Sequence, residues 1–171
     1  MKLNRNHRRR RGQALAEMAV MVPFLVIGMM GFLDLGRAFY YQISITNAVR
    51  EAARYAAQSH YYGIAPDCSG GAGSASCPVP GDSAIFVRLN QELQGIGVTI
   101  PSATPVSTVT VSPDAGGRMT CFNIPSQCSP PTQYPITVTA TYQFTFITPF
   151  IGSLFGGSIT LRSFATMRTD Y

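Results

Sequence analysis

The chain has 171 residues, of which 46% are hydrophobic, and a formal net charge of +5. This length allows one domain, with only a small core once a long helix has been subtracted. Six of the thirteen Lys and Arg residues lie in residues 1–12, so residues 13–171 contain seven basic and eight acidic side chains, a net charge of −1. We therefore expect no nucleic-acid partner, because the positive charge is confined to one end of the chain.

The first predicted element is one long helix over residues 13–58, which contains an apolar run at residues 14–33. As a helix this run would cover about 30 Å, the thickness of the hydrocarbon core of a bilayer. It is longer than the apolar core of a secretory signal peptide, which favours a retained single-pass anchor in contact with membrane lipid. The basic leader, residues 1–12, predicts a cytoplasmic N-terminus in the inner membrane and an exported remainder.

Glu17 is the single charge in the apolar run. A carboxylate at this depth costs roughly 2.5 to 3.5 kcal/mol on insertion scales unless it has a partner. Cleavage after Gly12 would supply one, because it would free the α-amine of Gln13 one helical turn from Glu17.

The arginine run and Gly12, followed by Gln13-Ala14-Leu15-Ala16-Glu17, resemble the prepilin peptidase site of type IV pilins and pseudopilins. With residues 34–40 (DLGRAFY) and 47–57 (NAVREAARYAA), the chain resembles more narrowly the TadE-like pseudopilins of tight-adherence (Flp) pilus systems. Met18 follows the glutamate, where those proteins usually have an aromatic residue. The resemblance implies a processing site at Gly12, Gln13 and Glu17, with a prepilin peptidase, other pilins or pseudopilins and the pilus assembly platform as partners.

Beyond the apolar run, the long helix becomes amphipathic. Its apolar stripe repeats at a spacing of about four residues and comprises Leu35, Phe39, Ile43, Ala48, Ala52 and Ala56. This stripe must pack on another surface. A sheet of the same chain is the favoured partner, since small residues permit close approach, and a neighbouring pilin-like subunit is the alternative.

Four cysteines follow in the exported part: Cys68, Cys77, Cys121 and Cys128. In an exported domain they predict two disulfides, and of the three possible connectivities the sequential pairing closes the shortest loops. A zinc site is the alternative. It is disfavoured because eight and six residues separate the cysteines of each pair and His60 is the one exported histidine, so we expect no metal and no cofactor.

Residues 59–171 are predicted to form an exported domain. Asp82 is a suitable N-cap for a short helix over residues 83–94, in which Ile85, Leu89 and Leu93 share one face. Alternation of apolar and polar residues at 109–111, 136–146 and 159–168 predicts strands. The expected fold class is α+β: a long N-terminal helix of pilin type packed on a small antiparallel sheet, with disulfide-stapled loops. The stretch 138–167 also resembles the C-terminal end of TadE-like proteins.

The connection between the last two strands, residues 149–155 (PFIGSLF), is unusually apolar for a hairpin. Its large side chains are Phe150, Ile151, Leu154 and Phe155. They either pack on their own domain, which is slightly favoured, or form a contact surface for the assembly machinery or the outer leaflet.

No catalytic motif is present: His60 has no companion, the Gly-rich stretches lack a P-loop lysine, and G-x-S-x-G and H-E-x-x-H do not occur. An enzyme is therefore not expected. The leading hypothesis is a minor pilin or pseudopilin that takes part in assembling a Flp-type pilus, and hence in cell adhesion. The alternative is an unprocessed, membrane-tethered adhesin or ligand-binding domain that uses the loops at 61–81 and 113–135.

Overall fold

The structure is a computed structural model that describes residues 5–101, 108–123 and 133–171, with side chains from residue 12 onward. The chain divides into two compact units. The first unit contains Met1–Ala38 and Thr145–Ser158, and the second contains Phe39–Phe144 and Ile159–Tyr171.

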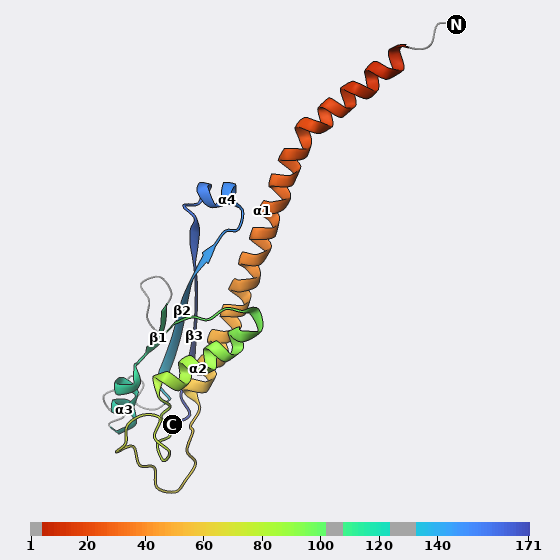
Figure 1. Ribbon diagram of the computed structural model, residues 1–171. Coiled ribbons are helices and arrows are strands. Elements are labelled where there is room, and N and C mark those ends of the chain that lie inside the picture. The colour runs from red at the N-terminus through yellow and green to blue at the C-terminus, as the bar shows by residue number, and fades with distance from the viewer. Residues whose placement is uncertain (1–4, 102–107, 124–132) are drawn as a thin grey trace. The chain divides into compact units, whose positions relative to one another are not determined.

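Helix α1 (Arg5–Ala57) is a single helix of 53 residues that contributes to both units (Figure 1). It begins eight residues before the expected start at residue 13, because arginine is a good helix former and no proline precedes residue 13. Pro23 lies inside it. The predicted long helix is therefore present, extended at its basic end.

In the second unit, α2 (Asp82–Leu93) follows the loop after α1. Ile85, Leu89 and Leu93 are all buried, as their shared face predicts. The helix continues into a short 3₁₀ turn, η1 (Gln94–Ile96), and ends at Gly97. Gly97 has a φ of 67°, a left-handed conformation that glycine adopts without strain.

The second unit also contains most of a three-stranded antiparallel sheet: β1 (Thr108–Ser112), β2 (Pro135–Thr145) and β3 (Ser158–Arg168). The strand order is β1-β2-β3, with β2 in the centre (Figure 1). Val109 is paired with Ala140 in an antiparallel register. Alternate residues of β2, including Ile136, Val138 and Ala140, are buried, which confirms the predicted period of two and the α+β class.

The core of the second unit lies where α1, α2 and the sheet meet. Ala48, Ala52 and Ala56 of α1 are fully buried there among apolar residues of α2 and β2. Phe39 and Ile43, earlier in the same stripe, are 61% and 60% exposed. The alanine half of the stripe therefore packs within the chain, as favoured, because alanine lets the helix approach its neighbours closely. Phe39 and Ile43, in the other half, are not buried by the chain.

Two short helices stand where loops were expected. Helix α3 (Ala115–Asn123) occupies part of the predicted loop at 113–135, and α4 (Pro149–Leu154) occupies the connection between β2 and β3 (Figure 1). Pro149 is suited to the first turn of α4. The loop at 61–81 contains no helix or strand. Its last five residues, 77–81, are buried, so only the earlier part of the loop lies at the surface.

Candidate functional site

The predicted processing site lies on the N-terminal part of α1. Gly12, Gln13 and Glu17 are all exposed, and the side-chain amide of Gln13 donates a hydrogen bond of 3.0 Å to a carboxylate oxygen of Glu17. The spacing of four residues places the two side chains on one helical face. The fold thus holds Glu17 within reach of the residue whose α-amine would be freed by cleavage after Gly12.

The segment that follows is an exposed apolar helix. Between Leu15 and Leu33 its large side chains lie on the surface, among them Met18 (60%), Phe24 (69%) and Phe32 (77%). Among the described residues, α1 is the one helix long and apolar enough to span a membrane. Exposure on this scale is unfavourable in water and is typical of a surface that meets lipid or another apolar helix.

Asp34 follows directly after the apolar run and is only 2% exposed. Its two carboxylate oxygens accept the backbone N–H groups of Ile147, at 3.2 Å, and Thr148, at 2.9 Å. The guanidinium of Arg37 lies 3.2 Å from the same carboxylate. A buried carboxylate needs such partners, so Asp34 fastens the β2–β3 connection to α1 within the first unit. Sequence reasoning missed this role, because the partners are backbone groups far along the chain.

The predicted contact residues of the β2–β3 connection differ in their surroundings. Phe150 (61%), Leu154 (70%) and Phe155 (57%) are exposed, and Ile151 is partly buried. A methyl group placed on Gly31 would lie 3.4 Å from the Ile151 side chain, so α4 packs closely on α1 at that glycine. The favoured interpretation, burial of all four side chains, is therefore wrong for three of them, since α4 is too short to turn every large side chain inward.

A cavity of about 440 Å³ adjoins this contact in the first unit. It is lined by Met30, Leu33, Asp34, Arg37, Ile147, Thr148 and Pro149. Most of these side chains are apolar, and the polar ones are held by the hydrogen bonds and ion pair of Asp34.

The first predicted disulfide pair is bonded: Cys68 and Cys77 are joined, with their Cα atoms 4.6 Å apart. The loop they close is further held by the backbone bonds Asp67 N–H to Ser76 O and Gly71 N–H to Cys68 O. A hydrogen bond from Ser69 N–H lowers the pKa of the Asp67 carboxyl. The other predicted pair, Cys121 with Cys128, includes Cys128, which lies outside the described residues.

Asp82 does not cap α2 as predicted; the N-cap is Gly81 and Asp82 is the first helical residue. Its carboxylate instead lies 2.7 Å from the guanidinium of Arg118, which is completely buried. Arg118 also donates to the carbonyl oxygens of Pro80 and Pro113, each at 2.8 Å. The buried positive charge requires a carboxylate, which overrides the capping preference. No sequence pattern indicated this pair, since Arg118 stands alone in a glycine-rich segment.

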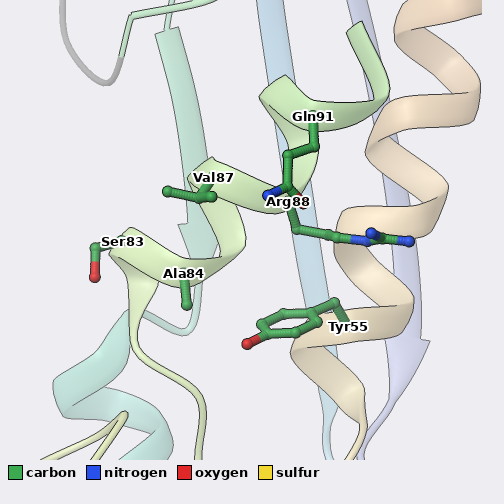
Figure 2. A pocket seen from close by; sticks show the side chains of 6 residues that line it. All are labelled: Tyr55, Ser83, Ala84, Val87, Arg88 and Gln91. Atoms are coloured by element: carbon green, nitrogen blue, oxygen red, sulfur yellow. The ribbon is translucent and has the colours of Figure 1, made fainter. Parts of the chain in front are cut away.

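A shallow pocket in the second unit lies between α1 and α2, lined by Tyr55, Ser83, Ala84, Val87, Arg88 and Gln91. Figure 2 shows the Arg88 side chain extending from α2 toward α1, above the ring of Tyr55. Its guanidinium is already engaged by Glu51 at 2.9 Å and Glu92 at 3.2 Å. Arg88 therefore links α2 to α1 by an ion pair with Glu51. Because its guanidinium is already paired, the described lining of the pocket lacks a free charged group that would orient a ligand.

Helix α1 therefore combines an exposed apolar part that contains Glu17 with an amphipathic part that packs in the core of the second unit. Residues 12–54 match the TadE-like protein family. The match confirms the predicted resemblance over this segment of α1. No curated protein and no solved structure matches the chain.

The TadE-like segment starts at Gly12, the predicted cleavage position, and ends at Arg54, three residues before α1 ends. It includes Gln13, Glu17 and Asp34. The disulfide loop, α4 and the stretch 138–167 lie outside it, so the resemblance predicted for the C-terminal stretch stays a prediction.

Proposed function

We propose that this chain is a membrane-anchored minor pilin or pseudopilin that takes part in assembling a Tad (Flp) pilus. In this proposal a prepilin peptidase cleaves the chain after Gly12, and residues 14–33 anchor it in the inner membrane. Residues 34–171 then lie on the periplasmic or extracellular side. The main support is that the TadE-like match, residues 12–54, includes the whole exposed apolar run and starts at the proposed cleavage residue.

The pairing of Gln13 with Glu17 supports the role of the glutamate. Their hydrogen bond of 3.0 Å lies on one turn of α1, so the α-amine of a cleaved Gln13 would arise close to the carboxylate. A positive amine next to Glu17 offsets the cost of placing this charge in lipid. The same carboxylate can pair with the amine of a neighbouring subunit, which would guide assembly.

The exposed residues Phe39 and Ile43 of the apolar stripe, with the neighbouring Tyr40, support a subunit contact. These three side chains are 55–61% exposed on α1, just beyond the apolar run. Their aromatic and aliphatic side chains bury large areas when two helices pack together. We therefore assign this surface to contact with other pilins or pseudopilins.

The decisive experiment determines the N-terminus of the full chain extracted from membranes of cells that make the pilus, with and without their prepilin peptidase. We expect Gln13 as the first residue when the peptidase is present and the intact leader when it is absent. Gly12→Val tests the bond directly, because a side chain at Gly12 has open space in the fold. Gly36→Val is the matched control, since Gly36 lies in the same helix with equally open surroundings.

Loss of processing in Gly12→Val but not in Gly36→Val would support the proposal. An intact leader in every sample, together with normal pilus production by cells that lack this chain, would contradict it and favour the membrane-tethered adhesin. That alternative predicts specific surface binding by an unprocessed chain.

A further inference from the structure

Helix α4 and its flanking residues present an exposed apolar surface in the first unit. We call it the α4 patch, defined by Ile147, Phe150, Leu154 and Phe155. The four side chains are 57–70% exposed. Phe155 stacks on Phe146 with ring centroids 5.7 Å apart. Such a patch on a short connection requires a partner or an apolar medium.

The α4 patch is attached to a defined level of α1. Asp34 accepts the N–H groups of Ile147 and Thr148, and Ile151 lies against Gly31. Gly31 is within the apolar run 14–33, and Asp34 is the first residue after it. If that run spans the bilayer, as the proposed function states, α4 lies at the boundary between acyl chains and headgroups.

The composition of the connection fits lipid better than a polar protein surface. Residues 145–158 (TFITPFIGSLFGGS) contain no charged side chain, although connections between strands are usually polar. Phenylalanine and leucine on one side of an interfacial helix bury themselves several ångströms into the headgroup and acyl boundary. The adjoining cavity, lined by Met30, Leu33 and Ile147 among others, gives an acyl chain a further apolar surface.

We propose that the α4 patch inserts into the bilayer leaflet on the exported side, so that the chain touches the membrane at both its span and α4. This inference rests on the proposed membrane anchoring by residues 14–33. Two attachments restrict the tilt of the first unit relative to the bilayer. A TadE-like subunit held in this way would meet incoming pilins at one fixed tilt.

The chain contains no tryptophan, so one introduced tryptophan reports on a single position. We would reconstitute three full-length variants, Phe150→Trp, Phe164→Trp and Phe24→Trp, in vesicles of phosphatidylethanolamine and phosphatidylglycerol. Quenching of the tryptophan emission by lipids brominated at shallow or deep acyl positions measures contact with the bilayer. Phe164 is the matched control, because it is 67% exposed, close to the 61% of Phe150, and lies on β3 in the second unit. Phe24 tests the span itself.

We expect shallow-position lipids to quench Phe150→Trp at least twofold more than Phe164→Trp, with a blue-shifted emission, and deep-position lipids to quench Phe24→Trp. Quenching of Phe24→Trp without quenching of Phe150→Trp would overturn the α4 inference while the membrane anchor stands, and would assign the patch to a protein partner. Equal quenching at Phe150 and Phe164 would also overturn it, because it indicates non-specific adsorption. No quenching at Phe24 would remove the anchor on which both proposals depend.

Discussion

The carboxylate of Asp34 accepts the backbone N–H of Thr148 at 2.9 Å, although the two residues are 114 positions apart in the sequence. This bond and its neighbour from Ile147 connect the end of the apolar run to the β2–β3 connection. Asp34 therefore contributes to the position of α4, together with the packing of Ile151 against Gly31.

Replacing Asp34 with alanine should release this connection. The variant leaves the N–H groups of Ile147 and Thr148 without an acceptor, which costs about 2 kcal/mol for a buried group. Amide hydrogen exchange at these two residues should then accelerate roughly 30-fold in the detergent-solubilised full chain. Arg37→Ala is the control, since it keeps the carboxylate and should have a smaller effect; unchanged exchange in Asp34→Ala would show that the bonds do not hold α4.

Glu17→Gln should impair assembly without affecting membrane insertion or cleavage. Its side chain keeps the shape of glutamate but cannot form an ion pair with an α-amine. If the pair contributes about 1.4 kcal/mol, co-purification with other pilus subunits should fall roughly tenfold. Glu92→Gln serves as a control carboxylate outside the apolar run. Equal recovery of partner subunits by both variants would mean that Glu17 has no role in association.

The disulfide of the glycine-rich loop should stabilise the second unit. Removing the Cys68–Cys77 bond, with its separation of nine residues, is expected to lower the free energy of unfolding by about 2.5 kcal/mol by the chain-entropy estimate. Chemical denaturation of the Cys68→Ser/Cys77→Ser variant measures this loss. Peptide mapping without reduction tests the remaining prediction, a bond between Cys121 and Cys128. A free thiol at either position would refute that second pair.

Asp82 should matter because it partners the buried Arg118. In Asp82→Ala the guanidinium keeps its bonds to Pro80 and Pro113 but loses its counter-charge, so we expect a loss of roughly 3 kcal/mol, measured by chemical denaturation. The double variant Asp82→Ala/Arg118→Met removes the charge as well and should recover part of the loss. A double variant no more stable than Asp82→Ala would indicate that packing of Arg118, rather than its charge, is important.

Alkaline pH should destabilise the second unit through two tyrosines. Burial raises the pKa of Tyr134 and of Tyr171, whose hydroxyl donates to the carbonyl oxygen of Ala56 at 2.9 Å. The folded state keeps these protons while the unfolded state loses them near pH 10, so stability is complete below about pH 10 and decreases above it. The expected slope is up to about 1.4 kcal/mol per pH unit for each tyrosine.

Chemical denaturation between pH 8 and 11 checks this slope. Tyr134→Phe and Tyr171→Phe should each reduce it, whereas Tyr62→Phe should not, because Tyr62 is 83% exposed. The same slope in all three variants would exclude the buried tyrosines as its cause.

The local sequence determined the features that depend on periodicity. The apolar run at 14–33 predicted a spanning helix because length and composition suffice for that inference, and the alternation at 136–146 predicted β2 because its side chains face opposite sides of the sheet. The processing site is a proposal that rests on a short motif, in which Gln13 and Glu17 lie one helical turn apart. Such features require no knowledge of distant parts of the chain.

Only the tertiary structure decided which residues meet across the chain. Asp82 was predicted to cap a helix, but its carboxylate pairs with the buried Arg118. No sequence pattern indicated that the carboxylate of Asp34 accepts hydrogen bonds from Ile147 and Thr148. The residues of 149–155 were expected to be mostly buried, yet Phe150 and Leu154 are exposed. The physical reason is shared by all three cases: the burial of a charge or a large side chain depends on long-range packing, which local propensity does not specify.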